Sequence, residues 1–378
     1  MAKFLSHEHS TVKKELVFFH TFGCQMNIHD TTKMSSHLQN ADYQISPFPE
    51  TADVIILNTC AIREKAEQKM RSALGKYYLL KKKNPDLFIG VVGCLAKQEG
   101  EEIIKRAPYV DMVLGPDYIG NLAELIHEKR FYNKPLIRTQ FKTKRAYEFP
   151  KNIETDPRKN ISSFVSIMKG CDKFCTFCIV PFVRGREVSR PSEEIISEIH
   201  DLVEKGAKEV ILVGQTVNTY GVHGGDCSFV ELVKRVANIQ GIKRIRFTSP
   251  HPSDFTDEQI SLFREIQKLC AHAHLPVQSG SNSILEKMKR GYTKEEYLEK
   301  ISKLKDANSN IAISTDIIVG FPSESDQDFA ETLSFIKQVE FSSIFSFIYS
   351  KRKWTKAENI ADNTSDSLKK ERFTELLK

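Results

Sequence analysis

The stretch that decides the fold covers residues 163–191 and reads Ser163-Phe-Val-Ser-Ile-Met-Lys-Gly-Cys171-Asp-Lys-Phe-Cys175-Thr-Phe-Cys178-Ile-Val-Pro-Phe-Val-Arg-Gly-Arg-Glu-Val-Ser-Arg-Pro191. Its apolar start predicts a buried strand that ends at Gly170. Three cysteines follow with the spacing C-x3-C-x2-C. Pro181 and Gly185 keep the next segment irregular until Pro191 opens a helix. A loop of this size can wrap its thiolates around a small metal cluster.

The number of cysteines favours one kind of metal site. Structural zinc sites usually take two ligand pairs, and this segment supplies three cysteines with no fourth nearby. Four-iron clusters normally take four thiolates, so three thiolates leave one iron open for a substrate or cofactor. The triplet therefore favours an iron–sulfur cluster over a zinc knuckle or three unrelated thiols.

Composition sets the limits for the rest of the chain. The 378 residues suffice for two or three domains, and 40% hydrophobic and 28% charged residues are ordinary for a soluble globular protein. No apolar run approaches ~18 residues, and the start of the chain lacks the apolar core of a signal peptide. We expect a cytoplasmic protein whose eight cysteines are metal ligands or free thiols. The net charge of +6 permits a nucleic-acid partner without demanding one.

The N-terminal third alternates strands and helices. Short apolar runs predict strands at 15–23, 53–59, 87–93 and 111–115, and longer stretches predict helices at 62–83 and 118–129. This alternation is typical of an open parallel sheet covered by helices, and we place the domain at residues 15–130.

Three cysteines share one position in this sheet. Cys24, Cys60 and Cys94 each follow the carboxyl end of a predicted strand. Ligands bind at that edge of open parallel sheets, and neighbouring strands lie about 5 Å apart, so the thiols can converge. They are either buried structural cysteines or the ligands of a second iron–sulfur cluster with one open iron, and we favour the cluster.

Residues 131–160 are predicted to be a basic linker. From Lys129 to Tyr147 the chain carries seven lysines or arginines, no acid and several aromatic residues. Such a segment either contacts RNA or is a solvated connector, and both interpretations stay open.

The remaining residues, 161–378, repeat the alternation six times. Strands are predicted at 164–168, 209–215, 244–249, 272–278, 311–320 and 343–349. Helices are predicted at 192–206, 229–239, 257–269, 281–289, 294–307 and 326–339. Six parallel strands predict a partial (β/α)6 barrel of the TIM type with its site at the carboxyl ends of the strands.

Several strand ends in this barrel carry candidate cofactor contacts. These are Gly214, Gln215, Gln278, Gly320 and Pro322, although turn chemistry explains each of them equally well. Cys227 and Cys270 are expected to be bystanders. His272 and His274 alternate with apolar residues and are not assigned as ligands.

The sequence resembles the radical SAM methylthiotransferases, and within them the MiaB-type tRNA branch, from about residue 15 to residue 359. The resemblance rests on motifs that stand here as Thr21-Phe-Gly-Cys-Gln-Met-Asn27, Asn58-Thr-Cys-Ala-Ile-Arg-Glu-Lys-Ala-Glu67, Val92-Gly-Cys94, Gly170-Cys-Asp-Lys-Phe-Cys-Thr-Phe-Cys-Ile-Val-Pro181, Arg184-Gly-Arg-Glu-Val-Ser-Arg190, His274-Leu-Pro-Val-Gln-Ser-Gly-Ser281 and Ser314-Thr-Asp-Ile-Ile-Val-Gly-Phe-Pro322.

The resemblance implies a reaction and its cofactors. Cys171, Cys175 and Cys178 would hold a [4Fe–4S] cluster that binds S-adenosylmethionine (SAM) and cleaves it to a 5′-deoxyadenosyl radical. Cys24, Cys60 and Cys94 would hold an auxiliary [4Fe–4S] cluster that carries the sulfur. The product would be a methylthio group on C2 of N6-isopentenyladenosine at position 37 of tRNA.

The resemblance also implies partners and leaves alternatives. It implies the anticodon loop of tRNA, an electron donor such as a flavodoxin or ferredoxin, and a monomer; it leaves the sulfur donor unnamed. Sister branches act on threonylcarbamoyladenosine in tRNA or on a ribosomal protein, and an inactive RNA-binding relative is a further alternative.

The sequence departs from the family pattern at three places. The chain stops about where the family's C-terminal TRAM domain would begin, so we expect that domain to be absent. Trp354 stands where the family has glycine in Tyr-Ser-x-Arg-x-Gly-Thr, and Ser323 stands at the second glycine of Gly-Phe-Pro-Gly-Glu-Thr.

Overall fold

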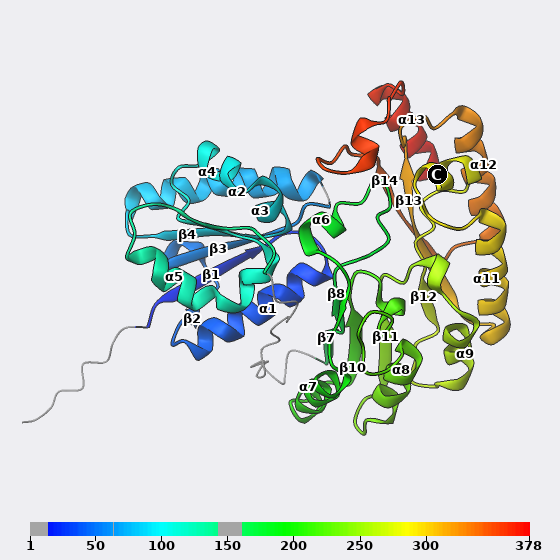
Figure 1. Cartoon of the computed structure of the whole chain (residues 1–378), viewed down its shortest axis with the longest axis horizontal. Helices are drawn as coiled ribbons and strands as arrows, with labels where there is room; N and C mark the ends of the chain where they lie inside the picture. The colour runs from blue at the N-terminus through cyan, green and yellow to red at the C-terminus, as the bar shows by residue number, and fades with distance from the viewer. Residues whose placement is uncertain (1–13, 63, 143–160) are drawn as a thin grey trace, which may run out of the picture.

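The computed structural model describes residues 14–62, 64–142 and 161–378. Figure 1 shows two α/β halves: a sheet with helices on both faces, and a curved set of strands with helices outside. The expected fold class is confirmed. Within the described ranges, no helix combines the length and apolarity needed to cross a membrane.

The N-terminal half is a six-stranded sheet in the order β2-β1-β3-β4-β5-β6, with every neighbouring pair parallel. Its strands are β1 (Leu16–Thr21), β2 (Gln44–Ile45), β3 (Val54–Thr59), β4 (Phe88–Gly93), β5 (Met112–Leu114) and β6 (Leu136–Arg138). Its helices are α1 (Gln25–Asn40), α2 (Glu64–Lys83), α3 (Cys94–Glu99), α4 (Glu101–Arg106) and α5 (Leu122–Arg130).

The central strands are continuously apolar because both faces of the sheet are covered. Ile55 and Leu57 of β3 lie in one core with Met70 of α2. Val54 and Ile56 lie in the other core, which includes side chains of α1 and α5. The short strands β2 and β6 were not predicted. Strand β6 falls inside residues 131–160, and the assignment of that segment to a linker stays a prediction; residues 143–160 of it lie outside the described residues.

The C-terminal half contains the six predicted parallel strands: β7 (Ser162–Ser166), β10 (Glu209–Val213), β11 (Arg244–Phe247), β12 (His272–His274), β13 (Ala312–Val319) and β14 (Ser343–Ile348). They form two ladders, β11-β10-β7 and β12-β13-β14, which together make a partial barrel. The outer helices are α7 (Ser192–Glu204), α8 (Phe229–Asn238), α9 (Asp257–Glu265), α10 (Asn282–Lys287), α11 (Lys294–Ala307), α12 (Asp326–Val339) and α13 (Asp366–Leu376).

Local sequence signals explain where several barrel helices begin. Helices α8, α9, α11 and α12 each start with a capping box, in which a serine or threonine accepts the N–H three residues on. The same boxes return a side-chain oxygen to the cap N–H, so two otherwise unpaired donors are satisfied at each start.

One short helix belongs to the barrel half in sequence and to the N-terminal half in packing. Helix α6 (Val180–Arg184) follows the three-cysteine loop and lies between the two halves in Figure 1. Ile179 and Val183 are buried in the same apolar core as Ile89 and Ala96 of the N-terminal sheet domain. This packing brings the cysteine loop of one half against the cysteine edge of the other.

Candidate functional site

The cysteines of the N-terminal half lie at the carboxyl ends of three adjacent strands. Cys24 precedes α1, Cys60 follows β3, and Cys94 is the first residue of α3. Strand β3 pairs with both β1 and β4, so the three thiols converge. Gly23 has φ +119°, and a Cβ there would stand 2.4 Å from the Cβ of Cys60. Only glycine allows the first thiol loop to approach the second this closely.

Two asparagines tie these thiol loops together. The side-chain amide of Asn27 donates to the Oδ1 of Asn58 (3.0 Å) and to the carbonyl of Thr59 (3.0 Å). The amide of Asn58 donates back to the carbonyl of Asn27 (2.8 Å). Both asparagines are fully buried. The motifs that begin at Thr21 and Asn58 therefore fix the relative positions of Cys24 and Cys60.

The surroundings of Cys24 favour its thiolate form. A hydrogen bond from the Cys60 thiol lowers the pKa of Cys24 to about 6 and raises the pKa of Cys60. Burial raises the pKa of Cys94, and the Arg184 guanidinium opposes that rise. Metal binding requires thiolates, so a bound metal would draw the remaining protons off.

The second group of thiols lies on the loop between the paired strands β8 (Met168–Lys169) and β9 (Val188–Ser189). The N–H of Cys178 donates to the carbonyl of Cys175 (2.9 Å), and the N–H of Cys171 donates to the carbonyl of Gly185 (3.1 Å). Burial raises the pKa of Cys171 and raises the pKa of Cys178 to about 12. Raised pKa values favour the protonated form of both thiols in the metal-free chain.

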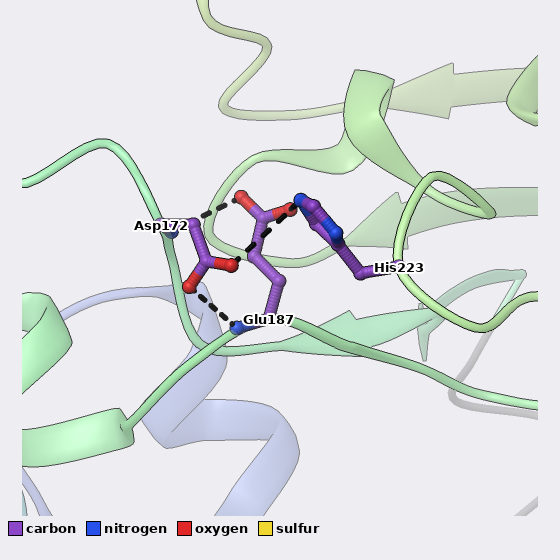
Figure 2. Close-up of side chains that lie close together, drawn as sticks. All are labelled: Asp172, Glu187 and His223. Carbon is purple, nitrogen blue, oxygen red and sulfur yellow. Dashed lines mark hydrogen bonds and ion pairs between the residues drawn. The ribbon is translucent and has the colours of Figure 1, made fainter.

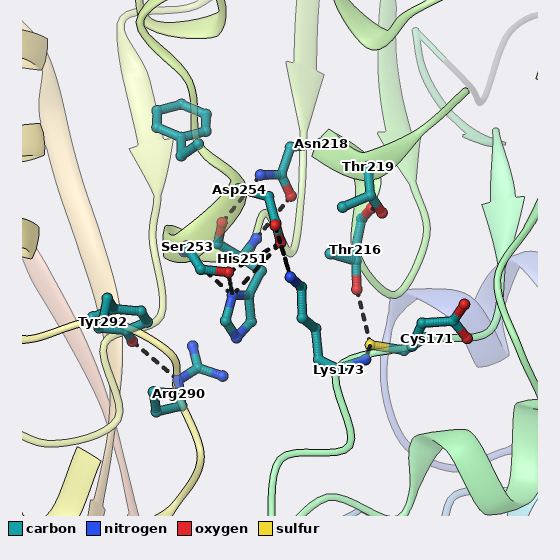
Figure 3. A network of polar contacts seen from close by, with 12 residues as sticks. Cys171, Lys173, Thr216, Asn218, Thr219, His251, Ser253, Asp254, Arg290 and Tyr292 are labelled. Atoms are coloured by element: carbon teal, nitrogen blue, oxygen red, sulfur yellow. Dashed lines mark hydrogen bonds and ion pairs between the residues drawn. The ribbon is translucent and has the colours of Figure 1, made fainter. Parts of the chain in front are cut away.

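Side chains from other barrel strands surround this loop, and Figure 3 shows part of the network. The hydroxyl of Thr216 lies 3.0 Å from the sulfur of Cys171. Arg290 donates from Nη1 to the sulfur of Cys175 (3.3 Å), and His251 Nε2 lies 3.8 Å from the same sulfur. Burial, with Arg290 and Lys173 nearby, lowers the pKa of His251, so its imidazole is neutral.

Arg184 connects the two thiol groups. It belongs to α6, six positions after Cys178, and its Nε donates to the sulfur of Cys94 (3.2 Å). Its Nη2 pairs with the carboxylate of Asp30 on α1 at 2.7 Å, and both side chains are buried. A guanidinium from the barrel half thus neutralises charge at the thiol edge of the sheet half.

A third polar cluster braces the barrel loop. Asp172, Glu187 and His223 approach one another in Figure 2. Glu187 accepts the N–H of Asp172 (3.2 Å), and Asp172 accepts the N–H of Glu187 (3.2 Å). Arg186 and Thr219 also donate to these carboxylates. The mutual bonds tie the residue after Cys171 to the residue before β9 and account for the cluster structurally.

The spacing of the thiols argues against single zinc ions. Among the described residues, the group in Figure 2 is the one set of three histidine, cysteine or acidic ligand atoms that lie within 4.8 Å of one another. Sulfurs around a single tetrahedral zinc stand about 3.8 Å apart, given Zn–S bonds of about 2.3 Å. In neither three-thiol group do all three sulfurs lie within 4.8 Å of one another, so neither group is arranged around a single zinc ion in this structure.

The structure gives structural roles to several residues predicted to contact a cofactor. Gln215 accepts the N–H of Gly170 (2.5 Å) and so holds the start of the cysteine loop. A Cβ at Gly214 would stand 2.6 Å from Met168, and one at Gly320 would stand 2.5 Å from Lys369 of α13. Gln278 (φ +79°) bonds through its backbone to Asp316. Buried Pro322 follows Gly320 by two positions. Contact of these five residues with SAM stays a prediction.

Two histidines that the sequence analysis did not assign as ligands share one partner. His272 and His274 both lie 3.0 Å from the hydroxyl of Ser314, in the barrel wall. Arg184, Arg290, His251 and Thr216 were missed. Three of them follow barrel strands or helices with no metal-ligand spacing, and only their contacts with cysteines mark them.

Comparison with known proteins follows the two halves. Residues 16–115 match the family described as "Uncharacterized protein family UPF0004", and residues 165–336 match the Radical SAM superfamily. A tRNA-2-methylthio-N(6)-dimethylallyladenosine synthase of Yersinia pseudotuberculosis is 48% identical over 357 residues, covering 93% of this chain and 75% of that protein. The synthase of the same name from Acinetobacter baylyi is 44% identical, covering 97% of this chain and 78% of its own.

The chain belongs to the tRNA-2-methylthio-N(6)-dimethylallyladenosine synthase family. Among solved structures, it is similar in fold to the radical SAM methyltransferase TsrM from Kitasatospora setae, with a TM-score of 0.66, 12% identity, and coverage of 91% of this chain and 75% of that one. As a family member it is a radical SAM methylthiotransferase whose cofactors are SAM and [4Fe–4S] clusters. Two groups of three converging free thiols, each flanked by a guanidinium, fit such clusters.

Proposed function

We propose that this chain adds a methylthio group to C2 of N6-isopentenyladenosine at position 37 of tRNA. The observation that carries the proposal is the pair of three-thiol groups, brought together by Arg184 across the two halves. Cys171, Cys175 and Cys178 would hold the cluster that binds SAM. Cys24, Cys60 and Cys94 would hold the auxiliary cluster. When bound, these cofactors supply the radical and the sulfur.

The side chains around the thiols have defined tasks in this proposal. Arg290 and Arg184 each place a positive charge on a cysteine sulfur, which stabilises the thiolate that iron needs. Thr216 lies against Cys171 and orients that thiol. His251 is held by reciprocal bonds with Asn218 (2.8 and 3.0 Å) and stays neutral, so it adds no charge beside Cys175.

Further parts of the proposal concern partners and place. We propose the anticodon loop of tRNA as substrate, because its bases are easily unstacked and the target base must leave any stack to reach the thiol groups. A flavodoxin- or ferredoxin-type protein would deliver electrons to a monomeric enzyme in the cytoplasm. All eight cysteines are free, which suits a reducing compartment.

Anaerobic reconstitution tests the proposal. The 378-residue chain is loaded with iron and sulfide, then given SAM, a reductant and tRNA that carries N6-isopentenyladenosine, and the digested tRNA is analysed by mass spectrometry. A 2-methylthio nucleoside is expected. Parallel reactions with tRNA that carries threonylcarbamoyladenosine and with ribosomal protein should yield no product; methylthiolation of either one instead would reject the substrate assignment.

Cysteine variants separate the two groups. Cys175→Ala should abolish SAM cleavage, and Cys60→Ala should keep cleavage but stop methylthiolation. Cys227→Ala is the matched control, because this cysteine lies in neither group and its loss should leave both activities intact. Methylthiolation by Cys60→Ala would refute the auxiliary-cluster assignment.

A further inference from the structure

A cavity of about 870 Å³ lies beside the first thiol group, between β1 and α2. We call it the α2 groove. Helix α2 contributes a single stripe to its wall, from Lys65 through Lys69 and Lys76 to Leu80, at spacings of three and four residues. The opposite wall includes His20 and Phe22, and Phe22 stands two positions before Cys24.

The lysines of this groove differ from Arg71 and Lys81 of the same helix. Lys65, Lys69 and Lys76 are exposed, and none has an ion pair within the described part of the chain. On the same helix, Arg71 pairs with Glu67 and Glu99, and Lys81 pairs with Asp111. One acid, Glu50, lines the groove against the three lysines, so its lining carries a net charge of +2.

In the described part of the basic linker segment, most of the basic side chains have partners. Lys129, Arg130 and Arg138 pair with Asp111, Glu15 and Glu128. Lys142 donates to Asn121 and lies over the ring of Tyr118. Lys134 is exposed and has no ion pair among the described residues, and Lys142 keeps its charge beside a neutral amide, so the α2 groove differs from that segment in lining one cavity and not in the amount of unpaired charge.

We infer that the α2 groove binds the sugar–phosphate backbone of the substrate RNA. This inference rests on the proposed function, which supplies an RNA substrate. Eleven residues of helix separate Lys65 from Lys76, about 16 Å at the helical rise. That length spans roughly five phosphates at the axial spacing of a stacked strand. Lys65 lies five positions after Cys60, so the bound strand leads to the first thiol group.

The end of the α2 groove at Lys65 lies close to the contact between the two halves. Beside the start of α2, the loop after β14 contacts the N-terminal half: Ser350 donates to Glu64 (2.9 Å), and Arg352 donates to the carbonyl of Ile62 (3.1 Å). The same loop bonds to the barrel's cysteine loop, because the N–H of Ala357 donates to the carbonyl of Thr176 (2.8 Å). An RNA strand that leaves the groove at Lys65 therefore reaches the place where the two halves meet.

The test compares two triple variants of the full chain with the wild-type protein. The groove variant is Lys65→Ala/Lys69→Ala/Lys76→Ala. The matched control is Lys208→Ala/Lys243→Ala/Lys337→Ala, which removes the same charge from exposed lysines of the barrel half. Binding of tRNA that carries N6-isopentenyladenosine is measured by fluorescence anisotropy across a range of salt concentrations, and circular dichroism verifies folding.

Loss of three phosphate contacts predicts a salt slope, log K against log [salt], shallower by about 2 and affinity about 100-fold weaker at 0.1 M salt. The control should stay within about threefold of wild type. The wild-type chain is also acetylated with and without tRNA, and the modified lysines are identified by mass spectrometry. Bound tRNA should protect Lys65, Lys69 and Lys76 from acetylation and leave the control lysines unprotected.

Each other outcome has a distinct meaning. If the groove variant binds tRNA as the control does, the groove inference is wrong and the proposed function stands. If the groove variant keeps its tRNA affinity but its reconstituted iron–sulfur clusters are reduced more slowly by an acidic flavodoxin, the groove binds a protein electron donor and the RNA inference is overturned. If the wild-type chain binds no tRNA, the proposed substrate and the groove inference both fail.

Discussion

Breaking the ion pair between Arg184 and Asp30 should destabilise the protein far more than breaking its exposed neighbour. The Arg184 side chain is 5% exposed and that of Asp30 is 1% exposed. Arg184→Met would leave a buried carboxylate without its cation and Cys94 without its donor. Removing one partner of a buried pair costs about 3–5 kcal/mol because the stranded charge stays out of water.

This magnitude converts to a measurable thermal shift. For a unit of 150–250 residues, each kcal/mol lowers the transition midpoint by roughly 2–4 °C. Arg184→Met should therefore lower the midpoint of the metal-free, reduced chain by about 6–20 °C in a calorimetric scan. Arg186→Met is the matched control two positions away, because its guanidinium is 63% exposed and pairs with Asp172 at the surface. Such pairs contribute about 1 kcal/mol or less.

A double variant identifies the cause. In Arg184→Met/Asp30→Asn the carboxylate charge is gone, so more than half of the lost stability should return. If Arg184→Met shifts the midpoint no more than Arg186→Met does, the two halves are not held by this pair. If the double variant is as unstable as the single variant, the loss comes from packing of the arginine stem and the charge argument is wrong.

Three further predictions concern single positions. Burial lowers the pKa of Lys33 to about 7, so the cost of burying its charge is full below pH 7 and fades as pH rises towards 10; urea unfolding should show stability increasing with pH in that window, and Lys33→Met should flatten the curve. The Cys24 thiolate, with a pKa of about 6, should be alkylated by iodoacetamide before any other cysteine of the metal-free chain at pH 7. Mass spectrometry of the labelled peptides measures this order, and equal labelling of Cys24 and Cys60 would contradict the prediction. Ser323→Gly and Trp354→Gly should each raise stability by about 0.5–1 kcal/mol in thermal unfolding, because both residues have positive φ (68° and 73°); Ser323→Ala, which keeps the strain, should bring no gain.

The positions of all six proposed ligands follow from two local features of the sequence. Continuous apolar runs locate β1, β3 and β4, and the parallel-sheet rule then places the next residue of each at a common edge. The C-x3-C-x2-C segment is a local feature by itself. Neither step requires knowledge of how the two halves pack, which explains why sequence reasoning reached both groups.

Contacts between segments that are distant in the chain could not be predicted from the sequence. Arg184 lies 90 positions from Cys94 and 154 from Asp30, and nothing in its own segment distinguishes it from Arg186. The sequence does not separate the groove lysines of α2 from ordinary surface charge, since the pairing of a lysine depends on neighbours that only the fold supplies. Helix α13 was missed because few of its residues are apolar, and its attachment depends on the buried contacts of Arg372 with Glu324.

The departures from the family pattern show what the sequence encodes at such positions. Ser323 and Trp354 stand where the family has glycine, and the backbone keeps the left-handed conformation that glycine permits. The geometry of each loop is therefore determined by its surroundings, and the non-glycine residue adopts a strained backbone conformation. For Trp354 the surroundings include Glu358, which accepts its N–H (2.9 Å).

Two of the links between the halves involve cysteine loops, beside others such as the ion pair of Lys169 with Asp117 (3.0 Å). Helix α6, directly after Cys178, packs into the sheet core and places Arg184 on Cys94. The loop after β14 bonds to Thr176 between two barrel cysteines and to Ile62 shortly after Cys60. Because each of these two links ends within a few residues of a proposed ligand, the separation of the two thiol groups is set by the fold and not by the substrate. The RNA must then bring its base to a fixed pair of sites, and the α2 groove, whose lining includes Phe22 two positions before Cys24, would guide the RNA backbone towards the first of them.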